Sequence, residues 1–195
     1  MQLFRSGCAL VLFFVGFAAV AHGQGQKTFP TDDEINLLLT QTDRALEQYK
    51  SVIDQEQIEM ERYAEAVAKD RQVANNLEFA LRALKSNPQG FNGLAGFGVV
   101  LWLDDASRNA LLCADGALND STLKLMAGDM KKANNLISLS RTCMDASTLL
   151  YTVSENASSL YERYIGAEEQ LAAKGLETVQ KCMDILKKNG LTPKK

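Results

Sequence analysis

Histidine is almost missing from this sequence, because His22 is the only one among 195 residues. Without histidine in the body of the chain, neither a Ser-His-Asp nor a Cys-His nucleophilic site can be assembled. Di-iron sites of helical bundles are excluded as well, since they need Glu-x-x-His pairs. The sequence also lacks the Cys-x-x-Cys pattern of zinc sites and of thiol exchange. We therefore expect a protein that is not an enzyme and has no catalytic, cofactor-binding or metal site.

Proline is scarce too, and it occurs only at Pro30, Pro88 and Pro193. These prolines leave stretches of about 57 and about 104 residues without interruption, and few folds other than helical ones do so. The length is that of one domain. The expected fold class is therefore all-α, with a single helical domain over residues 31–190 and a tail over 191–195.

The first 23 residues have the pattern of a signal peptide. Arg5 supplies a positive charge, an apolar run follows over residues 10–20, and small residues lie at alternate positions 19, 21 and 23, as at a cleavage site. The apolar run is short for a bilayer-spanning anchor, which needs about 20 residues. We expect cleavage near residues 21–23, export to the periplasm or the medium, and a disordered lead-in over residues 24–30.

Cleavage would leave three cysteines, Cys113, Cys143 and Cys182. If Cys143 and Cys182 share one straight helix, about 58 Å separates them, whereas a disulfide needs Cα atoms within about 7 Å. In an oxidising compartment we therefore favour a Cys113–Cys143 disulfide with Cys182 left as a thiol. The alternative is that these cysteines are reduced and buried as small apolar residues.

The charge balance excludes one class of partner. Loss of the signal peptide would leave 20 basic against 24 acidic residues. A nucleic-acid partner requires a concentrated positive field. We therefore expect no nucleic-acid binding, and only weak electrostatic attraction to anionic lipid.

A long helix is predicted over residues 31–87. It begins with a capping box, in which Thr31 precedes Glu34 by three residues, and it ends before Pro88. A heptad seam runs along it and is mostly apolar, with charged residues near its middle. Glu56, Glu59 and Asp70 fall on that seam; we expect them to be solvated, as helical acids usually are, with a buried acidic cluster as the alternative.

The connector over residues 88–119 is a short, glycine-rich and hydrophobic head. Its glycines, at positions 90, 93, 96 and 98, match neither a dinucleotide fingerprint nor a phosphate-binding loop. Its apolar stretch is too short to span a bilayer as a helix. Residues of the head that could contact a membrane or a partner are Phe91, Leu94, Phe97, Val99, Val100, Leu101, Trp102 and Leu103.

A second long helix is predicted over residues 120–189, after turn signals at Asp115–Gly116 and Asn119–Asp120. A line of residues spaced by seven marks an apolar seam that starts just inside this segment. The second line, three residues further on, is mostly small and would let a partner backbone come close. The first line consists of ten residues, all apolar except Ser158: Leu123, Met130, Ile137, Met144, Tyr151, Ser158, Ile165, Ala172, Val179 and Leu186.

Two architectures fit these elements. The first is an elongated antiparallel hairpin of two long, coiled-coil-like helices joined by the head. In that hairpin Asn75 comes opposite Asn134, and such a polar pair could set the register, unless both face water. The alternative is a folded-over four-helix bundle with breaks near Gly128 or Ser154.

Two functions fit the sequence. The first is an exported, non-catalytic structural or interaction module that acts by protein–protein contact or self-association, because its seam leaves apolar surface for another helix. The alternative is a membrane-active or lipid-interacting protein that uses residues 91–103, with Trp102 at headgroup level. In organisation, helical rods with a hydrophobic head, the chain resembles the α-helical pore-forming toxins. For the head itself we favour the simpler interpretation, in which it closes the end of the bundle as core.

Overall fold

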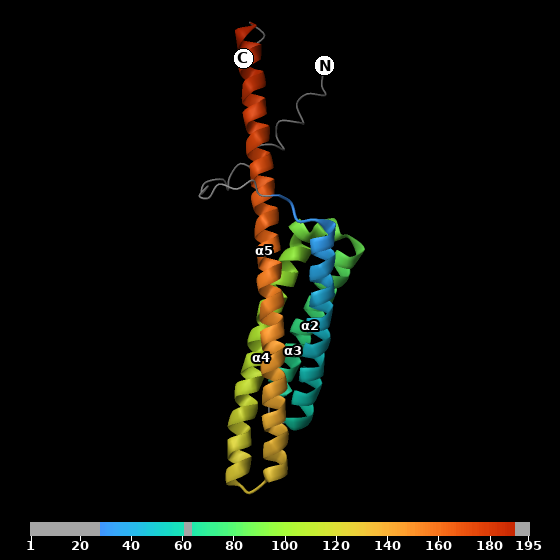
Figure 1. The fold of residues 1–195 in the computed structure, drawn as a ribbon, viewed down its shortest axis with the longest axis vertical. Helices are drawn as coiled ribbons and strands as arrows, with labels where there is room; N and C mark the ends of the chain where they lie inside the picture. Colours follow the sequence, from blue (N-terminus) through green and yellow to red (C-terminus); the bar gives the residue numbers. More distant parts are fainter. Residues whose placement is uncertain (1–27, 61–63, 190–195) are drawn as a thin grey trace. The chain divides into compact units, whose positions relative to one another are not determined.

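The computed structural model describes residues 28–60 and 64–189, and these ranges are helical almost throughout (Figure 1). The predicted all-α class is confirmed. The predicted signal peptide over 1–23 and the tail over 191–195 lie outside the described residues. The contacts divide the chain into two units, and the packed core belongs to the unit Phe29–Ile165.

Four α-helices and one short 3-10 helix make up the described residues. They are α2 (Asp32–Glu59), α3 (Ala64–Ser86), η3 (Pro88–Asn92), α4 (Leu94–Met126) and α5 (Met130–Lys188). The predicted capping box begins α2, because the Thr31 hydroxyl accepts from the Glu34 N–H and the Glu34 carboxylate accepts from the Thr31 N–H.

The helix boundaries differ from the prediction in two places. Residues 31–87 form two helices and not one, because α2 ends at Glu59 and α3 begins at Ala64. The predicted turns at Asp115–Gly116 and Asn119–Asp120 lie inside α4. The buried face of α4 continues through this stretch, so tertiary packing overrides the local turn signals.

The turn between α4 and α5 is built around Gly128, the position where the alternative architecture places a break. Gly128 has a φ of 80°, which only glycine adopts readily. Its N–H donates to the Leu125 carbonyl, and the Asp129 N–H donates to the Lys124 carbonyl, as in a Schellman motif. Asp129 then caps α5 by accepting from the Lys132 N–H at 3.0 Å. The other predicted break, near Ser154, is absent because α5 is continuous there.

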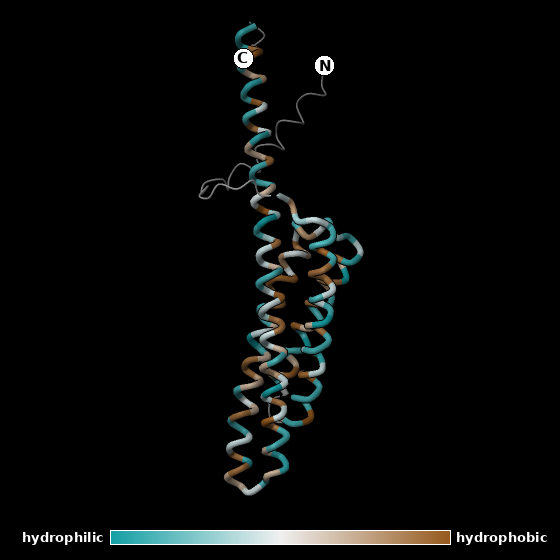
Figure 2. The backbone as a smooth tube through the Cα atoms, viewed as in Figure 1, coloured by the Kyte–Doolittle hydropathy of each residue, from teal (hydrophilic) through white to brown (hydrophobic). Residues whose placement is uncertain are grey.

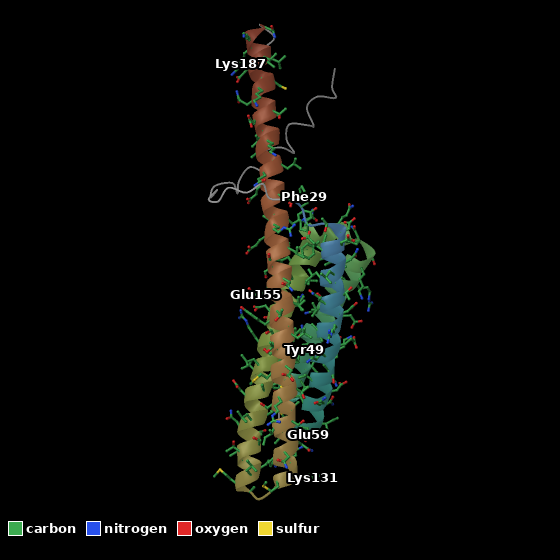
Figure 3. All side chains as sticks on the ribbon, viewed as in Figure 1. Phe29, Tyr49, Glu59, Lys131, Glu155 and Lys187 are labelled. Atoms are coloured by element: carbon green, nitrogen blue, oxygen red, sulfur yellow. A yellow bond between two sulfur atoms is a disulfide. The ribbon has the colours of Figure 1, made fainter. Side chains whose placement is uncertain are left out.

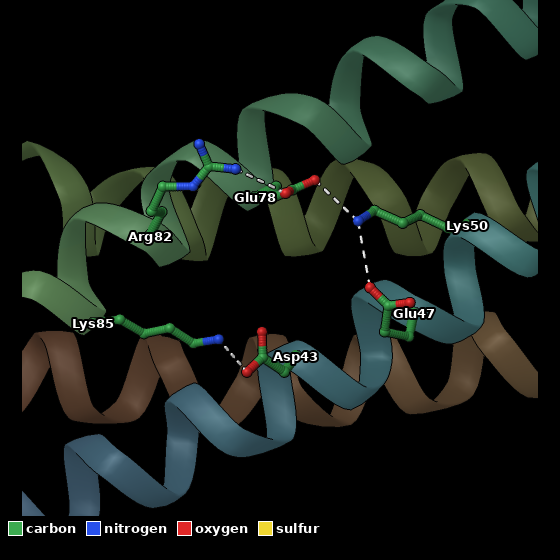
Figure 4. Close-up of polar contacts among 6 residues, drawn as sticks. All are labelled: Asp43, Glu47, Lys50, Glu78, Arg82 and Lys85. Carbon is green, nitrogen blue, oxygen red and sulfur yellow. Dashed lines mark hydrogen bonds and ion pairs between the residues drawn. The ribbon is translucent and has the colours of Figure 1, made fainter.

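Ion pairs join α2 to α3 in antiparallel order. Lys50 on α2 reaches Glu78 on α3 at 2.9 Å, and Arg82 holds the same carboxylate from its other side at 3.0 Å (Figure 4). Further along, Lys85 on α3 pairs with Asp43 on α2. These pairs are at the surface, so each contributes about 1 kcal/mol or less to stability. They show the pairing direction rather than the source of the stability.

α5 runs antiparallel to α2 in the same way. Glu34 at the start of α2 pairs with Arg163, and Glu59 at its end pairs with Lys132, each at 2.7 Å. α4 is antiparallel to α5 through a disulfide and serine contacts described below. The unit Phe29–Ile165 is thus an up-down bundle of α2, α3, α4 and the first part of α5, with the α4–α5 pair as an antiparallel hairpin within it (Figure 1).

The core side of α5 is the line of small residues, not the line of large ones. Ser140 and Ser147 are buried, whereas Met144 and Tyr151 of the predicted apolar seam are about half exposed. The reason is the close approach of α4. Small side chains let the two backbones come together, and each serine hydroxyl finds a carbonyl on α4. The large residues of the predicted seam are therefore placed outside the core.

The head is packed tightly where α3 crosses to α4. Phe91 of η3 is fully buried, and its backbone lies directly against Gly96 in the first turns of α4. A Cβ on Gly96 would overlap the Phe91 carbonyl. The glycine here therefore serves close packing of backbone on backbone.

The pairing of Glu34 with Arg163 generates a testable prediction. The hydrogen bond from Arg163 and the capping contact with Thr31 lower the pKa of Glu34 from 4.5 to about 2. The bound carboxylate stabilises the fold above pH 4.5, and this contribution is lost as the pH falls through about 2. In an Arg163→Gln variant we expect the pKa of Glu34 to rise toward 4.5, measured by NMR titration of its side-chain carbonyl.

An Arg141→Gln variant is the control, because Arg141 is exposed on the same helix and makes no contact with α2 among the described ion pairs. A pKa of Glu34 that stays near 2 in Arg163→Gln would contradict the pairing.

Candidate binding surface

The residues predicted for the head separate into three groups in the structure. Phe91, Val99 and Leu103 are fully buried, and Val100 and Trp102 are half-buried. The remaining three are exposed: Leu94, Phe97 and Leu101. The head thus contributes to the core with one face and leaves an apolar surface on the other.

An apolar groove lies between α3 and α4 beside the head. Its volume is about 330 Å³, and its larger lining residues are Phe79, Leu94 and Trp102. Phe79 is 75% exposed and Leu94 is 89% exposed. Side chains this large and this exposed are unusual on a surface that contacts only water.

A second apolar surface, which we call the outer strip, runs along the α4–α5 hairpin. On α4 it consists of leucines spaced by seven, and on α5 it consists of residues from the predicted seven-residue line. Its members are Leu111, Leu118 and Leu125 on α4, and Met130, Ile137, Met144 and Tyr151 on α5. All are between about 40 and 60% exposed except Ile137, which is half-buried. Figure 2 shows the hydrophobic segments recurring along both helices.

The serine contacts between α4 and α5 place the two halves of the outer strip side by side. The Ser107 hydroxyl donates to the Ser147 carbonyl at 3.1 Å, and the Ser147 hydroxyl donates to the Ser107 carbonyl at 2.9 Å. Leu111 follows Ser107 by one helical turn, and Met144 precedes Ser147 by one turn. Residues one turn apart share a helix face, so Leu111 and Met144 lie at the same level of an antiparallel pair.

The same register holds along the rest of the hairpin. The Ser140 hydroxyl donates to the Ala114 carbonyl at 2.9 Å. One turn away from this contact in each helix are Leu118 and Ile137. Because these serine contacts lie on the core side of the α4–α5 interface, the exposed residues of the outer strip lie along its opposite edge. It forms a continuous apolar track that the described residues do not cover.

The predicted disulfide is present. Cys113 on α4 and Cys143 on α5 are bonded, with Cα atoms 6.1 Å apart, and Cys182 is exposed and free. Closing a loop of 30 residues stabilises the fold by about 3.6 kcal/mol in the chain-entropy model. The disulfide fixes the register that aligns the outer strip.

The predicted register pair is not brought together in an apolar seam. Asn75 on α3 and Asn134 on α5 are both exposed to solvent. This corresponds to the alternative in which both side chains face water. The register is set by serines and by the disulfide instead.

The expectation that the seam acids are solvated is wrong for two of them. Glu56 and Asp70 are buried, at 3 and 5% exposure, and they form a polar layer with Tyr49 and Asn109 in the middle of the bundle, where Figure 3 labels Tyr49. Glu59 is half-buried and pairs with α5. The helix period alone cannot distinguish a seam acid that is buried from one that rotates into water.

The two carboxyl groups of the polar layer both have a raised pKa, which favours the protonated form. Burial, the neighbouring charge of Asp70 and a hydrogen bond with it together raise the pKa of Glu56 to about 7, and burial is the largest of these causes. Burial also raises the pKa of Asp70, against the opposing effect of the Tyr49 hydroxyl. Among the described residues, the Tyr49 hydroxyl and the Asn109 Nδ2 find no hydrogen-bond partner of normal distance and angle. The layer therefore costs stability when both acids are ionised.

This arrangement predicts a fold that weakens as the pH rises. Between pH 4.5 and about 7 the folded chain holds a proton on Glu56 that the unfolded chain releases, so stability falls across that window by about 3 kcal/mol. In Glu56→Gln the amide can donate to Asp70 without ionising. We expect a flatter dependence on pH and a more stable protein at pH 8, measured by urea unfolding from pH 5 to 8.

Glu155→Gln serves as the control, because it removes an exposed carboxylate of α5. Equal pH dependence in wild type and Glu56→Gln would show that the pKa of Glu56 is not raised in the folded chain.

Sequence reasoning missed the α4 half of the outer strip. The signal was present, since Leu111, Leu118 and Leu125 repeat at seven residues. It was hidden because Asp115–Gly116 and Asn119–Asp120 were interpreted as turns, which divided the repeat between two elements.

Other chemistry is not indicated in the part of the chain that the structure describes. Over residues 28–60 and 64–189, no group of three or more His, Cys, Asp or Glu side chains could hold a metal ion. None of the described helices combines the length and apolar character needed to cross a membrane. Comparison of the chain with protein-family models, curated proteins and solved structures finds no match.

Proposed function

We propose that this chain is an exported, non-catalytic helical protein that acts by binding an amphipathic helix of a partner protein along the outer strip. The observation that carries the proposal is the pair of exposed seven-residue apolar lines held at the same level on α4 and α5. Two antiparallel helices with flanking apolar residues present the groove into which a third helix packs.

The size and chemistry of the outer strip support a helical partner. From Leu111 to Leu125 the leucines repeat over two heptads, and Met144 and Met130 lie opposite them. Methionine adapts its shape to different partners because it is unbranched and flexible. Leucine and methionine side chains that are half exposed in the free protein gain the hydrophobic contribution of full burial only when a partner covers them.

Export is part of the proposal. The disulfide between Cys113 and Cys143 is typical of proteins that fold in an oxidising compartment. The apolar run over residues 10–20 and the small residues after it have the signal-peptide pattern. Mass measurement of the protein recovered from outside the cytoplasm would locate the N-terminus.

The outer strip is tested by site-specific photo-cross-linking in cells that produce the chain. A benzophenone amino acid at Leu118 should give a defined adduct, because a bound helix would contact this residue. The same amino acid at Gln72, exposed on α3, should give none. Leu111→Glu should reduce the Leu118 adduct about tenfold, since an unpaired charge in the interface costs at least the equivalent 1.4 kcal/mol.

Leu112→Glu is the matched control. Leu112 is the adjacent leucine and is also exposed, but it does not belong to the seven-residue line. Equal losses in Leu111→Glu and Leu112→Glu, or no adduct at Leu118, would contradict the proposal.

The groove beside the head favours a second candidate function, contact with lipid. Leu94, Phe97 and Phe79 present exposed apolar side chains near Trp102, and aromatic residues are stabilised at the headgroup level of a membrane. If this is correct, the protein should co-float with phosphatidylcholine vesicles, with a blue shift of Trp102 fluorescence. Leu94→Glu should remove both signals, while Leu112→Glu should retain them; an unshifted Trp102 spectrum and no flotation of the wild type would exclude lipid contact.

A further inference from the structure

The outer strip lies within one unit of the chain, so its two halves are placed relative to each other. The α4 half spans Leu111–Leu125, the α5 half spans Met130–Tyr151, and both belong to the unit Phe29–Ile165. Half-exposed apolar side chains over such a length are stabilised when another apolar surface covers them. The charges beside the strip indicate which surface this is.

Two oppositely charged side chains lie at one level of the α4–α5 hairpin. The Ser140 hydroxyl donates to the Ala114 carbonyl at 2.9 Å. Arg141 directly follows Ser140, and Asp115 directly follows Ala114. Because each residue adds a rise of about 1.5 Å, Asp115 and Arg141 lie within about 3 Å of the same height along the hairpin.

These two charges lie on opposite edges of the outer strip. Four residues past the serine contact, the α4 helix has turned by about 40° and reaches Leu118 in the strip. One residue past the contact, it has turned by about 100° in the same sense and reaches Asp115. The same steps on α5 lead to Met144 and Arg141. Each charge therefore lies beyond the apolar residues of its own helix, on the side away from the other helix.

Asp115 and Arg141 find no opposite charge in the part of the chain that the structure describes. Both side chains are exposed, and neither belongs to an ion pair within residues 28–60 and 64–189. Arg108, by contrast, pairs with Asp104 on its own helix at 2.7 Å. The outer strip thus has an acid on one edge and a base on the other, and both are available to a partner.

We propose that the helices covering the outer strip are those of a second copy of this chain, in a symmetric dimer whose two-fold axis is parallel to α4 and α5. This inference rests on the proposed function and names its partner. Rotation by 180° about such an axis places α4 of one copy over α5 of the other and leaves every level unchanged. Asp115 of each copy then faces Arg141 of the other copy, which forms two ion pairs.

The same rotation brings the apolar residues together level by level. The leucines on α4 of one copy meet the strip residues on α5 of the other copy. The facing pairs are Leu111 with Met144, Leu118 with Ile137, and Leu125 with Met130. Every contact occurs twice, with the roles of the copies exchanged, as a two-fold interface requires.

A two-fold axis across the helices does not match these charges. It would place α4 over α4 and α5 over α5, in opposite directions. With Leu118 at the centre, Asp115 would come opposite Thr122 of the other copy, and Arg141 would come near its Asn134. Neither charge would meet one of opposite sign, so the axis parallel to the helices is favoured.

The dimer is tested with the full chain by light scattering after size exclusion. Wild type should have twice the mass of one chain at high concentration and should dissociate on dilution. Asp115→Arg alone and Arg141→Asp alone should each raise the dissociation constant about tenfold, because both ion pairs become contacts between like charges. Gln72→Arg adds a positive charge on the exposed face of α3 and should leave the dissociation constant unchanged.

An equal mixture of Asp115→Arg and Arg141→Asp tests the direction of the axis. The mixed dimer has opposite charges at both contacts, so it should be as tight as the wild-type dimer. This recovery also shows that both variants are folded. A wild type that is monomeric at every concentration, a mixture no tighter than the single variants, or an equal loss in Gln72→Arg would overturn the proposal.

The mass of the Leu118 photo-adduct in cells separates this inference from the proposed function. An adduct with twice the mass of one chain supports the second copy as partner. A defined adduct of another mass would leave the proposed function standing and would overturn the dimer. The absence of any adduct would contradict both.

Discussion

The close approach of α4 and α5 is the constraint on which the rest of the bundle depends. Ser107 and Ser147 exchange hydroxyl-to-carbonyl hydrogen bonds across this interface, which requires the two backbones to be nearer than large side chains would allow. The same approach brings Cys113 and Cys143 within bonding reach. Small polar residues, rather than leucines, therefore determine how these helices meet.

The exposed apolar surface of the α4–α5 hairpin is a consequence of the close approach of the two helices. An interface of serine and alanine has no room for Leu111 or Met144, so these side chains lie at its outer edge, where about half of each is exposed. A leucine-filled interface would have hidden them and separated the helices. The close approach of α4 and α5 therefore both sets their register and leaves an uncovered apolar track.

The α2–α3 side of the bundle buries two acidic side chains at a cost in stability. Glu56 and Asp70 occupy positions that an apolar pair would fill with a gain in stability. The raised pKa of Glu56 favours its uncharged form below about pH 7, so one charge is kept out of the core there. We expect such a layer to favour one arrangement of these helices over shifted ones, because any shift would leave the carboxyl groups without each other.

The sequence indicated which segments are helical better than it indicated which face of each helix is buried. Long stretches without proline indicated helices, the capping box located the start of α2, and the separation of Cys143 from Cys182 identified the disulfide. The seven-residue line through Met144 was correctly recognised as a repeat but was assigned to the core. Periodicity shows that residues share a face, but only the packing of neighbouring helices decides which face is inside.

The turn signals inside α4 and the burial of Glu56 could not be predicted for the same reason. Asp115–Gly116 is a turn pair in isolation, yet it is helical because the face on its far side is buried through the whole of α4. Glu56 is buried because Asp70 comes to it from another helix. Both outcomes depend on contacts between segments that are distant in sequence, and a local pattern contains no record of them.

The glycine-rich crossover into α4 is more rigid than its composition suggests. Four glycines among apolar residues suggest a pliable loop, yet Gly96 is pressed against the Phe91 backbone with no space for one more carbon atom. Phe91 is sealed inside the end of the bundle. This corner is therefore rigid. It cannot open gradually, because any opening would release Phe91 and expose the end of the core in one step.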